Sequence, residues 1–172
     1  MVRRSLPWLG LGLAVAVIAA DQLSKWGIVA GVFGRSFADG GLFDGGLDPA
    51  PVLVTGFLNV VLFGNRGVSF GLFGGAQGQT VLVVVALVIV AALVFWLWRV
   101  KLALLAAGIG LIVGGALGNV IDRLRFGAVV DFLDFHAFGL HWPAFNLADS
   151  AIVVGVALLL LDGLFGRHSS VE

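Results

Sequence analysis

The segment that decides the fold is LALLAAGIGLIVGGALGNVIDR, residues 102–123. Its first part, Leu102–Ile121, carries no charge and has the length of about 20 residues that an apolar helix needs to cross a bilayer core. Small side chains recur at every fourth position, and such a stripe allows a second helix to approach closely in lipid. These small residues are Ala106, Gly110, Gly114 and Gly118. We therefore predict a membrane-spanning helix that packs on its neighbours through a narrow face.

The composition of the whole chain indicates the same class of protein. Of the 172 residues, 60% are hydrophobic and 12% are charged, and the mean hydropathy is +1.10. Soluble domains are usually about 45–50% apolar and about 25% charged, so an ordinary soluble domain is excluded. We predict a mainly α membrane protein with a single domain, residues 1–172, and four transmembrane helices at about 8–29, 79–98, 102–121 and 146–165.

Two connecting segments are expected to be ordered loops outside the bilayer. Residues 31–78 are rich in Gly, Asp and Phe, and residues 122–145 contain an alternating run at Val129–Phe135. Alternation between turn-forming residues is typical of short strands. We therefore predict short strands in these two segments.

The distribution of Lys and Arg predicts the orientation. Basic residues with little accompanying acid lie at both chain ends and in the turn between the second and third spans, at Arg3, Arg4, Arg99, Lys101 and Arg167. Since cytoplasmic loops carry an excess of Lys and Arg, both termini are expected in the cytoplasm and both long loops outside it. The formal net charge of +0 gives no basic surface for nucleic acid, and the absence of Cys excludes disulfides and thiolate chemistry.

The first span has a second interpretation. Arg3 and Arg4 followed by an apolar run resemble a cleavable signal peptide. The same apolar run continues into Asp21 and Lys25, which are four residues apart and therefore lie together on a helix. We favour a retained span whose outer end carries this structural pair of polar residues.

Polar residues cluster at the outer end of segment 102–123. Asp122 is expected at the negative end of the helix dipole, where an acid needs a cationic partner, and Arg123 or Arg125 could supply one. This ion pair would explain both residues without a functional role. Asn119 is harder to explain in that way, because it lies one turn inside the span, where an amide needs hydrogen-bond partners.

Two further acids follow at the same face of the membrane. Asp131 lies in the strand-like run, and Asp149 lies at the outer start of the fourth span, three residues after Asn146. Taken singly, Asp131 could be a solvated charge on an edge strand, and Asn146 with Asp149 could be a helix cap. Together, the two carboxylates could converge on one water molecule and share one proton, because repulsion and burial raise one pKa. Such a pair could hydrolyse a peptide bond with no metal or other cofactor.

These residues resemble those of a known family, the lipoprotein signal peptidases (signal peptidase II). The resemblance covers nearly the whole chain and rests on four motifs that occur in the family's order. They are Asp21–Lys25 (DQLSK), Asn65–Gly71 (NRGVSFG), Gly114–Arg123 with Gly127–Phe132 (GGALGNVIDR and GAVVDF), and Phe145–Ile152 (FNLADSAI). The resemblance implies an aspartic endopeptidase of the bacterial inner membrane, with four transmembrane helices and a small extracytoplasmic β-sheet cradle.

The resemblance also implies roles for individual residues. By motif, the catalytic aspartates correspond to Asp131 and Asp149, and the residues that contact substrate or inhibitor correspond to Asn65, Asn119, Asp122, Arg123 and Asn146. The implied substrates are diacylglyceryl-modified prolipoproteins in membrane lipid, and the implied inhibitors are globomycin-like cyclic peptides. The active site would face the extracytoplasmic side, and no cofactor would be needed.

Two other enzyme chemistries fit short parts of the sequence. Gly67–Gly71 matches the nucleophile-elbow pattern around Ser69, with His136 or His141 as a conceivable base. That elbow requires a large α/β sheet, which four membrane spans do not provide. Asp134 with the two histidines could bind a metal, but their spacing lacks the tight pattern of a ligand set.

A transporter is the alternative outside enzymes. Asp21, Lys25 and Asn119 could form a polar relay within the membrane. The chain lacks the paired half-repeats and interrupted spans that are typical of transporters. The peptidase hypothesis is therefore favoured, and it alone requires both Asp131 and Asp149.

Overall fold

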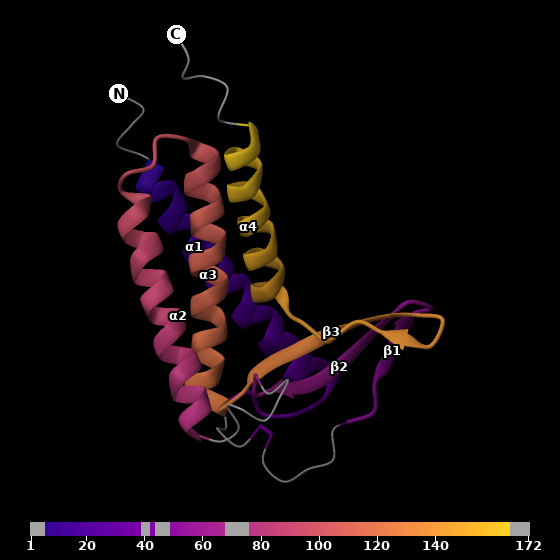
Figure 1. Ribbon diagram of the computed structural model, residues 1–172. Coiled ribbons are helices and arrows are strands. Elements are labelled where there is room, and N and C mark those ends of the chain that lie inside the picture. The colour runs from indigo at the N-terminus through magenta and orange to yellow at the C-terminus, as the bar shows by residue number, and fades with distance from the viewer. Residues whose placement is uncertain (1–5, 39–41, 44–48, 68–75, 166–172) are drawn as a thin grey trace.

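A computed structural model of the chain describes residues 6–38, 42–43, 49–67 and 76–165. Four long helices form a bundle (Figure 1). They are α1 (Leu6–Trp26), α2 (Ala76–Leu97), α3 (Ala103–Phe126) and α4 (Leu147–Phe165), and α1 continues into a short π-helix, η2 (Gly27–Val32). Each long helix has the length and apolar composition needed to cross a membrane, which confirms the predicted class.

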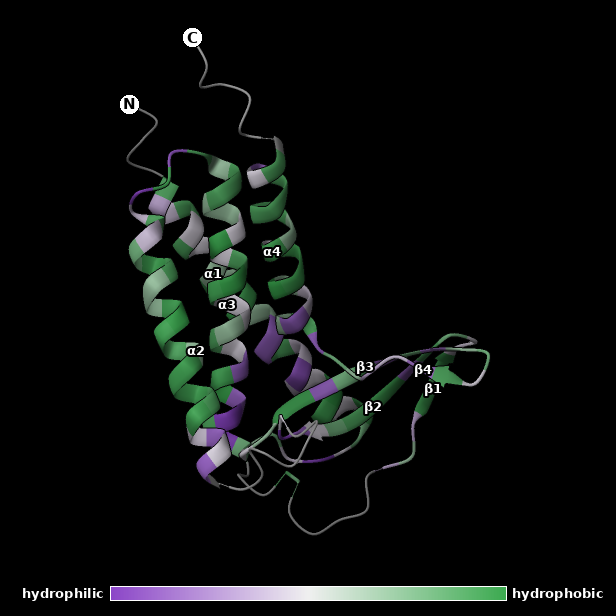
Figure 2. Ribbon diagram, viewed as in Figure 1, coloured by the Kyte–Doolittle hydropathy of each residue, from purple (hydrophilic) through white to green (hydrophobic). Residues whose placement is uncertain are grey.

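Hydrophobic side chains cover the outside of the bundle. Large apolar residues such as Val88 on α2 and Val153 on α4 are exposed on its surface. The hydrophilic residues instead gather where the helices meet the sheet (Figure 2). This arrangement is the one expected of a helical bundle that is surrounded by lipid along its length and by water beyond its ends.

A small antiparallel sheet projects from one end of the bundle (Figure 1). Its strands follow the order β1 (Val52–Thr55), β2 (Leu58–Asn65), β3 (Val129–Ala137) and β4 (Leu140–His141). The strand predicted from the alternating run is therefore confirmed, and it pairs with a strand of the first long loop. In this pairing Phe63 lies opposite Asp131. The sheet joins the two long connecting segments beside the helix ends.

α3 is the central helix, since α1, α2 and α4 all pack against it. Its glycines contact the backbone of the neighbouring helices. A β-carbon at Gly110 would overlap the carbonyl oxygen of Gly10 on α1, and one at Gly115 would overlap the carbonyl oxygen of Ala148 on α4. The predicted close approach through small residues is confirmed, and Gly115 extends it to a second face of the helix.

The end of α3 differs from the prediction. The span was expected to end at Ile121, but the helix continues to Phe126 and stops at Gly127, which has a φ of +66° and donates its N–H to the carbonyl oxygen of Arg123 at 3.1 Å. A left-handed glycine at this position is a common helix stop. Asp122 therefore lies within the helix, and it is the arginines at 123 and 125 that occupy the last turn, where a cation is favourable.

The backbone contact at Gly110 leads to a stability prediction. Gly110→Ala should destabilise the bundle by about 1–3 kcal/mol, because the added methyl group must push α1 away from α3. Thermal unfolding of the purified protein in detergent measures this effect. Gly12→Ala on α1 is the matched control, since a β-carbon there meets nothing within 4 Å, and it should not lower the melting temperature. Equal melting temperatures for the Gly110 variant and wild type would contradict the packing described.

Candidate active site

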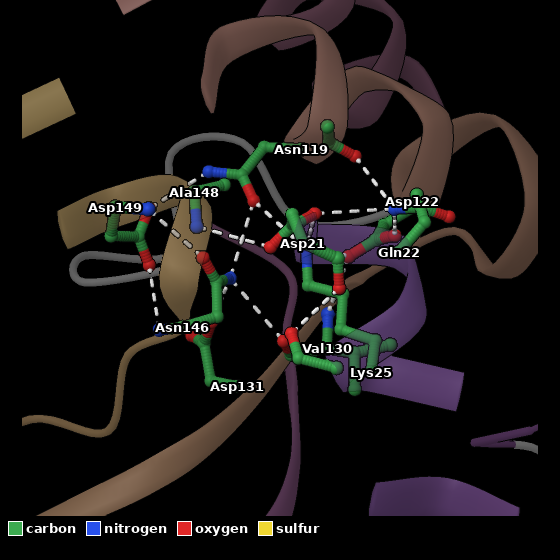
Figure 3. Close-up of polar contacts among 12 residues, drawn as sticks. Asp21, Gln22, Lys25, Asn119, Asp122, Val130, Asp131, Asn146, Ala148 and Asp149 are labelled. Atoms are coloured by element: carbon green, nitrogen blue, oxygen red, sulfur yellow. Dashed lines mark hydrogen bonds and ion pairs between the residues drawn. The ribbon is translucent and has the colours of Figure 1, made fainter. Parts of the chain in front are cut away.

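A buried ion triad joins the first and third helices. Lys25 Nζ lies 2.7 Å from an oxygen of Asp21 and 2.6 Å from an oxygen of Asp122, and all three side chains are completely buried (Figure 3). The predicted pairing of Asp21 with Lys25 is confirmed. The ion-pair partner predicted for Asp122 is wrong, because the cation that contacts its carboxylate is Lys25, and Arg123 interacts with Asp122 only at longer range. The long side chain of Lys25 reaches Asp122 where α1 and α3 are in close contact.

Asn119 links this triad to the fourth helix. Its amide nitrogen donates a hydrogen bond to Asp149 Oδ1 at 2.8 Å. Its side-chain oxygen, Oδ1, accepts hydrogen bonds from Lys25 Nζ at 3.4 Å and from the side-chain nitrogen of Asn146 at 3.2 Å. The amide that the sequence placed inside the membrane span therefore has the partners that such a position requires.

Asn146 caps α4 and contacts both candidate catalytic carboxylates. Its side-chain oxygen accepts the N–H of Asp149 at 2.9 Å, while Asp149 Oδ2 accepts the N–H of Asn146 at 3.3 Å. This is the reciprocal cap that the sequence predicted. The amide nitrogen of Asn146 also donates to Asp131 Oδ1 at 2.7 Å. One side chain thus fixes the start of α4 relative to β3.

The two candidate catalytic aspartates differ in exposure. Asp131 is completely buried on β3, whereas Asp149 is half-buried in the first turn of α4. Asn65 on β2 donates its amide N–H to Asp131 Oδ2 at 2.9 Å, so both oxygens of Asp131 accept hydrogen bonds. Burial, together with the charge of Asp149, raises the pKa of Asp131 to about 7, although the bonds from Asn65 and Asn146 act in the opposite direction.

Arg123 also lies at this site and has a donor group that the described part of the chain does not use. Its guanidinium interacts electrostatically with Asp149, Asp131 and Asp122. It makes a long hydrogen bond of 3.5 Å to the backbone carbonyl oxygen of Asn119. Its buried Nε has no hydrogen-bond partner among the described residues. The guanidinium therefore retains donor capacity.

Gln22 also belongs to this hydrogen-bond network, although the sequence did not predict it. Gln22 donates its amide N–H to Asp122 Oδ1 at 2.9 Å and to Asp21 Oδ2 at 3.2 Å, and so bridges the two carboxylates of the triad. Its position beside Asp21 at the polar end of the first span was the available signal. The structure thus brings together every residue proposed for the site, and Gln22 joins them. The proposed residues are Asp21, Lys25, Asn65, Asn119, Asp122, Arg123, Asp131, Asn146 and Asp149.

The profile of the signal peptidase (SPase) II family matches residues 13–165. The chain belongs to the signal peptidase II family. A lipoprotein signal peptidase of Ralstonia nicotianae is 46% identical over 162 residues, which cover 92% of this chain and 84% of the relative. A lipoprotein signal peptidase of Burkholderia vietnamiensis is 48% identical over 161 residues, which cover 92% and 87% respectively.

Two solved structures of a bacterial membrane enzyme have the same fold as this signal peptidase II chain. A structure at 2.3 Å resolution has a TM-score of 0.69 and 30% sequence identity, and covers 95% of this chain and 94% of its own. Another at 1.9 Å resolution has a TM-score of 0.71 and 30% identity, with coverages of 91% and 92%. The helical bundle with its small sheet is therefore the architecture of a membrane enzyme, and family membership makes this one a protease.

The residues of the alternative metal site lie on β3 and β4 of the sheet. His141 Nδ1 lies 2.9 Å from Asp134, and its ring stacks on that of His136 at 5.2 Å between centroids. Asn59 on β2 donates to Asp134 at 3.0 Å. Within the described residues, no group of three His, Asp or Glu side chains is arranged to hold a metal ion. Ser69 of the alternative nucleophile elbow lies outside the described residues.

The hydrogen bond from Asn65 leads to a titration prediction. Because this bond lowers the pKa of Asp131, Asn65→Leu should raise that pKa above about 7, so that Asp131 stays protonated to higher pH. The carboxyl ¹³C chemical shift of labelled protein measures the midpoint. Asn59→Leu, on the same strand, is the matched control, since Asn59 bonds to Asp134 instead. An unchanged or lower midpoint in the Asn65 variant would show that this bond has no such effect.

Proposed function

We propose that this chain is an aspartic endopeptidase that removes signal peptides from prolipoproteins, with Asp131 and Asp149 as its catalytic pair. The observation that carries the proposal is the network around Asn146, which contacts both carboxylates at the polar end of a membrane bundle. Family membership and the naming of the relatives as lipoprotein signal peptidases support it. No group other than the two carboxylates is required for the proton transfers.

The environments of the two aspartates suggest a division of roles. Asp131 is buried and has its pKa raised to about 7, so it is the member that holds the shared proton. Asp149 is half-buried and can accept a proton from a water molecule. The water oxygen then attacks the scissile carbonyl carbon while Asp131 protonates the carbonyl oxygen. When the C–N bond breaks, the leaving nitrogen takes the proton from Asp149, and Asp131 recovers its own from the hydroxyl of the intermediate.

The position of the pair supports a substrate that lies in the membrane. Asp131 lies on β3 and Asp149 lies in the first turn of α4, so a substrate cleaved between them would span or enter the bilayer beside the cut. Figure 2 shows that hydrophilic residues gather where these two elements meet. We assign the substrates as prolipoproteins whose cysteine carries a diacylglyceryl group in membrane lipid. Asn65, Asn119, Arg123 and Asn146 are the proposed polar contacts for substrate and for globomycin-like cyclic peptides, since their side chains surround the pair.

We place the protein in the bacterial inner membrane with its active site on the extracytoplasmic side. The start of α1, the end of α4 and the link between α2 and α3 all lie at the end of the bundle opposite the sheet (Figure 1). That link carries Arg99 and Lys101, and basic residues favour the cytoplasmic side. The aspartates lie at the other end, beside the sheet.

The catalytic pair is tested by replacing each carboxylate with its near-isosteric amide. Asp131→Asn, Asp149→Asn and the double variant should each lose nearly all activity, because groups that act as one unit are not additive. The initial rate of cleavage of a lipidated prolipoprotein at matched enzyme levels measures the loss. His136→Ala and His141→Ala are the controls and should retain substantial activity. A near-normal rate in either single Asn variant would exclude the two-aspartate mechanism.

The orientation is tested by reporter fusions. A fusion at Arg99 should report the cytoplasm, and fusions near Asp44 or Ala137 should report the extracytoplasmic side, because of the charge distribution. Alkaline phosphatase is active only outside the cytoplasm and serves as the reporter. The reverse pattern would place the aspartates on the wrong side for processing exported proteins.

A further inference from the structure

The residue before each candidate catalytic aspartate is held by a carboxylate of the ion triad. The backbone N–H of Val130, which precedes Asp131, donates to Asp122 Oδ2 at 3.1 Å. The backbone N–H of Ala148, which precedes Asp149, donates to Asp21 Oδ1 at 3.0 Å. The two contacts are equivalent in form, although the two aspartates come from a strand and a helix.

The ammonium group of Lys25 connects these two contacts. It binds Asp21 at 2.7 Å and Asp122 at 2.6 Å, and all three side chains are completely buried. Attraction between buried charges is strong, so the separation of the two carboxylates is held closely. Through the backbone N–H groups, the same separation is passed on to β3 and to α4.

We propose that Asp21, Lys25 and Asp122 are positioning residues that set the spacing between Asp131 and Asp149. The proposal rests on the proposed function and adds to it the part that α1 plays, since the first helix supplies none of the candidate catalytic residues. Both oxygens of Asp122 already accept bonds inside the protein, from Gln22, Lys25 and Val130. Asp122 is also completely buried, so in this proposal it acts through other residues.

A second set of backbone bonds, at the sheet, also affects the spacing between Asp131 and Asp149. The backbone of Phe145 pairs with Leu133 on β3, with N–H to oxygen distances of 3.1 and 2.9 Å. This pairing holds the segment before α4 on β3 at the sheet side. The triad holds the helix side through the backbone N–H groups of Val130 and Ala148, and the amide of Asn146 adds a bond to the carbonyl oxygen of Val130 at 3.2 Å. A change in the triad should thus tilt one aspartate relative to the other without unfolding the sheet.

The decisive variant is Lys25→Arg. The guanidinium keeps the charge, and therefore the pairing of both buried carboxylates, but it is larger and planar, so it must separate them. We expect kcat on a lipidated prolipoprotein to fall about 10- to 100-fold, as for a misplacement of about 1 Å, with KM within twofold of wild type. The alkaline limb of the pH profile should move to lower pH, because a more distant Asp149 raises the pKa of Asp131 less.

A second variant removes the bridge without leaving a buried charge. In Asp21→Asn/Lys25→Met/Asp122→Asn, each amide can still accept the backbone N–H, while the ion pairs are gone. Neutral replacement of a complete buried ion network is often tolerated by the fold. We expect it to accumulate in the membrane and to lose kcat as Lys25→Arg does. Arg125→Lys is the control for the first variant, since Arg125 lies on α3 like Asp122 but bonds to the carbonyl oxygen of Phe37, and it should keep wild-type kinetics.

The outcomes separate this proposal from others. A lower kcat with unchanged KM in a folded variant supports it. A folded variant with wild-type kcat and pH profile overturns it, as does a change confined to KM, which would indicate a binding role. Failure of both variants to accumulate would show that the triad serves only the fold. A wild-type protein that cannot cleave the substrate would contradict the proposed function instead.

Discussion

The arrangement of this molecule depends on backbone contact between α3 and its neighbours. Gly110 and Gly114 face α1, and Gly115 faces α4, in each case against main-chain atoms. In lipid there is no hydrophobic drive for helices to associate, so close van der Waals contact has to supply the attraction. It is this contact that brings Lys25 within reach of Asp122 and Asn119 within reach of Asp149.

Polar groups buried in a membrane protein need partners, and the side chains of Asp21, Lys25, Asn119, Asp122, Asp131 and Asn146 supply them to one another in one continuous network. The ammonium of Lys25 contacts three oxygen atoms, and the amide of Asn146 serves a strand and a helix at once. An unpaired group at this depth would cost several kcal/mol, on the order of a sizeable part of the stability of a whole domain. The network is consequently a stabilising feature as well as the setting for chemistry, and the two roles use the same atoms.

Much of this could be predicted from the sequence, for local reasons. Uncharged runs locate the helices because the bilayer demands a fixed length, and the spacing of Asn146 and Asp149 predicts a cap because capping spans one turn. The partner of Asp122 could not be found in this way, since it depends on how two distant helices approach. The end of α3 was placed too early because its last turn is polar, although Gly127 was a visible stop signal.

The distribution of the site along the chain has a consequence for biosynthesis. Asp21 and Lys25 lie on α1, which is made before α4, where Asp149 lies. At about 5–20 residues per second, the first helix waits on the order of ten seconds for the rest of the site. During that time the pairing of Asp21 with Lys25 within α1 keeps the segment formally neutral, which eases its entry into lipid. The two proposed catalytic aspartates are therefore not both in place until α4 has been inserted.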